Sequence, residues 1–196
     1  RGDQPALICV SSETGAERAV DVHDGAGATQ VTYGKGMGVG SKSGVTLAEL
    51  RSSGLVFVGF GIVAPEYTWN DYAETDVHGK TVVVLANDPG YAGKDPKVFR
   101  GGAMSYYGRW SYKIEEAARQ GAAGVLLIHD ADALGFGWDV VRNNWSGAQL
   151  DLAAAADAAA GVPARPAIEG WVQKDAARAL FGAARPDVNA LSGAAG

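Results

Sequence analysis

The residues able to form a metal or acid–base site are few in this chain, which has three histidines and one cysteine. His129, Asp130 and Asp132 form the one group to consider, because the adjacent His23 and Asp24 would point to opposite faces of a strand and His78 has no second histidine nearby in the sequence. They follow an apolar run, and the carboxyl ends of parallel strands are where α/β sheets place their sites. A catalytic zinc ion needs several protein ligands, whereas aspartate is also frequent in solvated turns. This cluster is therefore the one candidate for metal binding or acid–base catalysis, with an ordinary turn as the alternative.

Two further catalytic patterns are missing or incomplete. The sequence contains no Gly-x-Ser-x-Gly nucleophile elbow, and Cys9 lies within an apolar run, where a thiol is normally inert. Residues 36–43 approach the phosphate-binding loop pattern, but Ser41 stands where that pattern requires glycine. No clear apolar strand leads into this segment, so we interpret it as a flexible loop or an edge strand.

Aromatic residues with polar neighbours form two dense groups outside the expected strands and helices. Aromatic and arginine side chains in loops are typical of recognition surfaces, but large rings also fill the ends of a small core. The sequence leaves both interpretations open. The candidate substrate or interface residues are Tyr106, Tyr107, Arg109, Trp110, Trp138, Asn144 and Trp145.

These groups must be positioned by strands and helices that the apolar pattern reveals. The apolar residues occur in short runs separated by glycine, proline, asparagine and aspartate, a pattern typical of strand-rich folds. Residues 81–85 form the strongest strand and are apolar on both faces, so we expect them at the centre of a sheet. Residues 18–33 predict a β-hairpin with its turn at 24–27. The other predicted strands are 6–10, 55–58, 125–128 and 166–169.

In two segments the apolar residues recur with the spacing of a helix. Trp110, Ile114 and Ala117 begin a stripe that ends near Gly121, which predicts an amphipathic helix between two apolar strands. A strand, a helix and a second strand in this order predict a parallel pair. Residues 174–184 predict a last helix, and the alanine-rich segment 153–160 predicts a weakly held helix or a loop.

Length and charge exclude several classes of protein. The 196 residues carry a net charge of −5, which argues against a nucleic-acid partner, and no apolar run is long enough to cross a membrane. One cysteine excludes a disulfide framework. Because the chain begins with Arg1 and shows no leader, we expect a processed chain or a piece of a larger protein.

A series of motifs across residues 45–184 resembles the protease-associated (PA) domain inserted in bacterial zinc-dependent exopeptidases of the aminopeptidase and glutamate-carboxypeptidase type. The helix that ends in Gly121-Ala122 before a buried strand looks like the hallmark of that domain. The first 44 residues resemble it only loosely, mainly at residues 31–34. The motifs are Leu55–Tyr67, Trp69–Tyr72, Asp76–Val84, Gly102–Trp110, Tyr112-Lys113, Glu115–Val125, Asn144–Gly147 and Glu169–Trp171.

The resemblance implies an α+β fold of the swivelling β/β/α type, with about six or seven strands and two main helices. It divides the chain into an N-terminal flank with a β-hairpin (1–44), the PA domain (45–184) and a frayed tail (185–196). It also implies a secreted or periplasmic parent protein, whose catalytic domain and peptide or protein substrate are the expected partners.

The same resemblance implies a chain without catalytic or metal-binding residues of its own. In that family the zinc ligands, a His-x-Asp pair and a Glu-Glu pair among them, lie in the peptidase domain, so zinc is expected only there. No His-x-Asp motif occurs here, and the only Glu-Glu pair, Glu115-Glu116, falls in the predicted helix. By analogy, residues 106–110 are the candidate surface for a peptide or for the catalytic domain.

Two functions of other classes remain as alternatives. One is a free-standing peptide- or glycan-binding module that uses Tyr107, Trp138 and Trp145. The other is a small metal-dependent hydrolase built on the cluster at residues 129–132.

Overall fold

The computed structural model describes residues 4–8, 19–24, 27–42, 48–93, 96–145 and 165–181. Over these residues the chain is a mixed α/β protein, and six strands form one mixed sheet in the order β1-β5-β8-β9-β10-β4. Two small antiparallel pairs, β2-β3 and β6-β7, lie outside it. The strands are β1 (Gln4–Ile8), β2 (Ala19–Asp24), β3 (Gly27–Thr32), β4 (Met37–Gly40), β5 (Leu50–Phe57), β6 (Val63–Ala64), β7 (Trp69–Asn70), β8 (Thr81–Leu85), β9 (Gly124–His129) and β10 (Ile168–Gln173). The helices are α1 (Pro89–Gly93), α2 (Trp110–Arg119), α3 (Ala131–Leu134), α4 (Trp138–Trp145) and α5 (Lys174–Leu180), with 3₁₀-helices η1 (Pro65–Tyr67) and η2 (Tyr106–Gly108).

The centre of the sheet is parallel and its two edges are antiparallel. β5, β8, β9 and β10 run in the same direction, which confirms the predicted parallel pairing of the strands before and after α2. All five residues of β8 are buried, as expected for a central strand. The edge strands β1 and β4 pair antiparallel with β5 and β10. The predicted N-terminal flank therefore supplies both edges of the main sheet.

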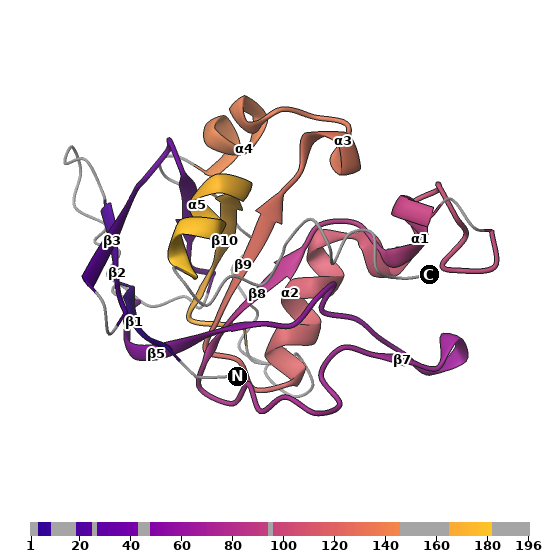
Figure 1. The fold of residues 1–196 in the computed structure, drawn as a ribbon, viewed down its shortest axis with the longest axis horizontal. Helices are drawn as coiled ribbons and strands as arrows, with labels where there is room; N and C mark the ends of the chain where they lie inside the picture. Colours follow the sequence, from indigo (N-terminus) through magenta and orange to yellow (C-terminus); the bar gives the residue numbers. More distant parts are fainter. Residues whose placement is uncertain are drawn as a thin grey trace, which may run out of the picture.

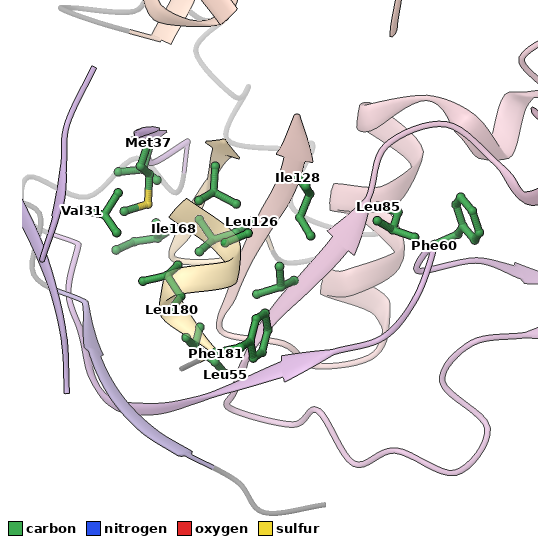
Figure 2. Close-up of a cluster of buried hydrophobic side chains, with 14 of the residues drawn as sticks. Val31, Met37, Leu55, Phe60, Leu85, Leu126, Ile128, Ile168, Leu180 and Phe181 are labelled. Atoms are coloured by element: carbon green, nitrogen blue, oxygen red, sulfur yellow. The ribbon is translucent and has the colours of Figure 1, made fainter. Parts of the chain in front are cut away.

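Alternate residues of the central strands feed two separate hydrophobic clusters, one on each face. Val83 and Leu126 belong to the cluster that α5 covers, whereas Val82 and Leu127 belong to the cluster that α2 covers. Figure 2 shows the first cluster, where Leu180 and Phe181 lie close to Leu55. Figure 1 places the β2-β3 hairpin at one end of the molecule and the segments with β7 and α1 at the other, beyond α2.

The two helices predicted from their period are present, but the buried face of α2 differs from the predicted stripe. Ile114 and Ala117 are buried as expected, whereas Trp110 is 49 % exposed, so its placement on the inward stripe was wrong. Trp110 is the first residue of α2, and its ring contacts that of the buried Trp171 from the outside. The charged Lys113 and Glu116 are buried instead.

Several short elements were not predicted, and the described residues alone contain ten strands, more than the expected six or seven. β6 and β7 contain two residues each, too few to show a period. Residues 37–40 form the edge strand β4, which was one of the two interpretations of the glycine-rich segment. β10 covers 168–173 and not 166–169, because its apolar residues continue through Val172. The predicted alanine-rich segment 153–160 and the tail from residue 185 lie outside the described residues.

Burial of the central strand leads to the first testable expectation. Val84 has no exposed surface, so Val84→Ala should lower the free energy of unfolding by about 1–3 kcal/mol. Val140 is 39 % exposed, so Val140→Ala should change the free energy of unfolding by less than about 0.5 kcal/mol. Urea unfolding followed by circular dichroism measures both. Equal losses for the two variants would contradict this description of the core.

Candidate recognition site

Tyr107 is the centre of a cluster of aromatic rings formed by η1, η2 and the start of α2. Its ring centroid lies 4.9 Å from that of Tyr112, 6.1 Å from that of Tyr106 and 6.4 Å from that of Tyr67. The three contacts have edge-to-face geometry, which aromatic pairs prefer. We call Tyr67, Phe99, Tyr106, Tyr107 and Tyr112 the tyrosine cluster.

Part of the tyrosine cluster is open to solvent. Tyr106 is 59 % exposed and Tyr67 is 37 % exposed, whereas Phe99 is fully buried beneath Tyr67 at a centroid distance of 4.4 Å. Met104, which is 41 % exposed, precedes η2. The exposed rings therefore rest on a buried aromatic base, which holds them in place without covering them.

A carboxyl group, that of Glu66, lies beside Tyr107 on this aromatic surface. The Tyr107 hydroxyl donates a hydrogen bond to Glu66 Oε1 at 2.5 Å. This bond lowers the pKa of Glu66 and, together with partial burial, raises the pKa of Tyr107 to about 12. At neutral pH the pair therefore presents the negative charge of Glu66 and the neutral hydroxyl group of Tyr107.

The segment that carries Tyr106 and Tyr107 is fixed from below by the end of β8. Asp88 is buried, and its Oδ2 accepts hydrogen bonds from the backbone N–H of Ser105 at 2.8 Å and from Ser105 Oγ at 2.6 Å. Asn87, which has a left-handed φ of 64°, donates from Nδ2 to the carbonyl of Ala133. The Ser105 bonds connect the residue before η2 to the carboxyl end of the central strand, and the Asn87 bond connects the same strand end to α3.

Gly108 is required at the closest approach between η2 and this strand end. A Cβ at residue 108 would lie 3.0 Å from Asn87 Oδ1 and 3.1 Å from Asp88 Oδ2. It would also lie 2.7 Å from Met104 Cγ. A larger residue here would push η2 away from the buried polar groups, and the exposed tyrosines would move with it.

Lys113 is a second buried charge under the same segment. It has no exposed surface, and its Nζ donates a hydrogen bond to the carbonyl of Phe60 at 2.6 Å. Burial lowers the pKa of Lys113 to about 7, while the negative charges of Asp71 and Asp88 act in the opposite direction. Burial also raises the pKa of Asp71, whose Oδ2 accepts from the backbone N–H of Ile62 at 2.9 Å. The polar groups thus connect α2, β8 and the segment after β5.

The second predicted group of aromatics lies on a helix and not in a loop. Trp138, Asn144 and Trp145 belong to α4, which packs against β4. Trp138 Nε1 donates to the carbonyl of Gly34 at 3.0 Å, and the Tyr33 hydroxyl donates to the carbonyl of Trp145. Both tryptophans are half-buried, so they mainly fix α4 on the sheet, whereas Asn144 is exposed.

A chain of ring contacts nevertheless joins the two predicted groups. The ring of Trp110 lies 6.0 Å from that of Trp171, which lies 6.3 Å from the ring of His129. The ring of His129 lies 5.5 Å from that of Trp138. Arg109, the remaining candidate, is exposed between η2 and α2. The structure therefore places Tyr106, Tyr107, Arg109 and Trp110 on one continuous segment, with Trp138 connected to it through buried rings.

The cluster at residues 129–132 is engaged in interactions within the protein. His129 Nε2 lies 3.0 Å from the carbonyl of Phe136, and burial lowers the pKa of His129. Asp130 caps α3 by accepting from the backbone N–H groups of Asp132 and Ala133, and it forms an ion pair with Lys174 at 3.3 Å. Within the described residues no group of three or more histidine, cysteine or acidic side chains could hold a metal ion.

Reasoning from the sequence missed Glu66 and Tyr67 as site residues, along with the buried supports Asp88 and Lys113. Pro65-Glu66-Tyr67 is too short to show a period, and its side chains meet Phe99 and Tyr107 only in the folded chain. One signal was available for Lys113, because a lysine beside Ile114 interrupts the apolar face of a predicted helix.

The fold and this surface define a mixed α/β domain with an exposed aromatic surface. No protein-family model, curated protein or solved structure matches the chain. None of the helices in the described ranges has the length and apolar character needed to cross a bilayer.

Proposed function

We propose that this chain is the protease-associated domain of a zinc-dependent exopeptidase, where it acts in substrate access or recognition and does not catalyse the reaction. The ordered motifs across residues 45–184 carry this proposal. Its partners are the catalytic domain of the same parent chain and a peptide or protein substrate. Zinc belongs to that catalytic domain, and the parent protein is secreted or periplasmic.

The position of the exposed rings supports a recognition role. Residues 106–110, which the resemblance directs toward a peptide or the catalytic domain, include the exposed Tyr106, Arg109 and Trp110. Exposed aromatic and arginine side chains on a rigid base are typical of binding hot spots. Asp88 fixes Ser105, the residue before this segment, and Lys113 bonds the helix that follows it to the carbonyl of Phe60.

The coding sequence on both sides of this chain tests the family. We expect a His-x-Asp motif on one side and a Glu-Glu motif on the other, since the family's peptidase domain supplies those zinc ligands. Flanking sequence that encodes an unrelated domain would contradict the proposal. Peptidase activity of the isolated chain that a chelator abolishes would contradict its non-catalytic role.

Arg109→Ala in the parent enzyme tests the role of the surface. Arg109 is exposed, so its removal should shift the midpoint of thermal unfolding by no more than about 2 °C. The KM for a peptide substrate should rise about threefold or more, with kcat less affected. Val84→Ala is the matched control, because it should lower stability without a specific change in KM. Equal thermal destabilisation by the two changes would contradict the placement of Arg109.

A free-standing peptide-binding module is the second candidate function, and the exposed tyrosine cluster favours it. The same surface would then act without an attached peptidase. Binding of peptides by the isolated chain, combined with flanking sequence that lacks peptidase motifs, would favour this alternative.

A further inference from the structure

Tyr107 of the tyrosine cluster donates a hydrogen bond to a carboxyl group, that of Glu66, which has no cationic partner among the described residues. Among the described residues, no lysine, arginine or histidine forms an ion pair with Glu66, and its side chain accepts a hydrogen bond from the Tyr107 hydroxyl. Glu66 is exposed, and the next residue, Tyr67, has 37 % of its surface open to solvent. A negative charge therefore sits beside accessible aromatic rings.

A carboxylate beside aromatic rings is suited to bind a cation. The face of an aromatic ring attracts a cation, and the attraction adds to that of a nearby carboxylate. The planar guanidinium of arginine can stack on a ring while it donates two hydrogen bonds to a carboxylate. A neutral apolar ligand would leave Glu66 desolvated and unpaired, which is unfavourable.

The aromatic rings are already fixed in place, so binding of such a ligand would cost little side-chain conformational entropy. Tyr67 stacks on the buried Phe99 at 4.4 Å, and Tyr107 contacts Tyr112, which is also buried. The Tyr112 hydroxyl in turn donates to the carbonyl of Val63 at 3.0 Å. Preorganised side chains lose little conformational entropy when a ligand binds.

We propose that Glu66, Tyr67, Tyr106 and Tyr107 form a binding site for a cationic side chain, that of arginine in particular, within a peptide segment. This inference rests on the proposed recognition function and names the chemical class of the peptide. Arg100 and Arg109 are exposed and adjoin the same segments in the sequence. If they dominated the surface, an acidic peptide would bind better, so the test includes one.

The test uses the purified 196-residue chain and three capped pentapeptides that differ only at a central arginine, glutamine or glutamate. Titrations followed by amide chemical shifts in NMR spectra give a dissociation constant for each. We expect the arginine peptide to bind about tenfold more tightly than the glutamine peptide, with shifts at residues 66, 67, 106 and 107. Higher salt should weaken this preference, because exposed charges are screened.

Two variants separate the site from the rest of the surface. Glu66→Gln should weaken binding of the arginine peptide about fivefold to tenfold and remove most of its advantage over the glutamine peptide, since the charge pair is lost. Glu74→Gln, at an exposed carboxyl group outside the tyrosine cluster, is the matched control and should change neither constant. Both residues are exposed, so both variants should fold, and their melting temperatures check this.

The remaining outcomes distinguish failure of the arginine-binding inference from failure of the proposed recognition function. Equal affinity for the three peptides, or tighter binding of the glutamate peptide, would overturn the inference and leave peptide recognition intact. An unchanged arginine affinity in Glu66→Gln would also overturn it. Absence of binding for every peptide would contradict both the inference and a recognition role for this surface.

Discussion

Replacing Lys113 by methionine should remove a rise in stability that the wild-type protein shows between about pH 7 and pH 9.5. Lys113 is fully buried, and burial lowers its pKa from 10.5 to about 7. Between these two pH values the unfolded chain holds a proton that the folded protein has released. The contribution of Lys113 to the free energy of unfolding therefore increases with pH across this window, and this contribution levels off below pH 7, where Lys113 is protonated in both states.

The expected size of the effect is large for a single residue. Each pH unit inside the window contributes at most about 1.4 kcal/mol, so the rise between pH 7.5 and 9.5 should be about 2–3 kcal/mol. Above about pH 10 the sign reverses, because burial raises the pKa of Tyr112 to about 12 and the folded state then holds the extra proton. Measurements should therefore stop below pH 10.

Urea unfolding at several pH values measures this effect. Lys113→Met also leaves the Phe60 carbonyl without its hydrogen bond, which should cost about 1–3 kcal/mol at every pH. The slope against pH is therefore the diagnostic quantity, and the variant should be nearly flat. Lys35→Met, at an exposed lysine, should keep the wild-type slope. Parallel curves for the wild type and Lys113→Met would show that Lys113 does not titrate in this window.

Replacing Asp88 by alanine should destabilise the protein by about 3 kcal/mol or more. The change leaves both donors of Ser105 without their buried acceptor, and it removes a negative charge that acts on Lys113. Ser105→Ala removes only the hydroxyl bond and should cost about 1 kcal/mol. Asp132→Ala, at an exposed aspartate, controls for loss of a carboxyl group as such.

The same variants separate a local effect from a global one. Because Asp88 fixes the segment before α2, Asp88→Ala should speed amide hydrogen exchange at Gly108 and Arg109 more than in β9. The double variant Asp88→Ala/Lys113→Met should differ from the sum of the single variants by about 0.5–3 kcal/mol, since the two charges interact. Additive losses, or equal losses for Asp88→Ala and Ser105→Ala, would contradict a coupled buried network.

Part of the fold was predictable because local spacing reflects burial directly. Residues 81–85 and 125–128 are apolar on both faces, and a segment with helical spacing lies between them. This order predicted that the two strands are central and parallel to each other. The hairpin of β2 and β3 was also predicted, because alternating residues flank a glycine-containing turn. These elements depend mainly on their own apolar pattern.

β4 was only one of two interpretations of its segment and α4 was not predicted, because contacts with distant segments stabilise both elements. β4 is rich in glycine and pairs with β10, where a Cβ at residue 170 would lie 2.3 Å from the carbonyl oxygen of Gly38. Only glycine permits this close approach of the two strands. α4 depends on the buried Val141 and on the bond from Trp138 to Gly34, both of which need the folded sheet.

The sequence by itself determined which residues were available for recognition, namely the aromatic and arginine side chains at 106–110, and which central strands and helices form the core. Only the tertiary structure decided that Glu66 and Tyr67 join them, and that Asp88 and Lys113 support them from below. The physical reason is that a periodic pattern reports burial along one element. A pairing between side chains far apart in the chain leaves no such pattern, since it depends on how separate elements meet.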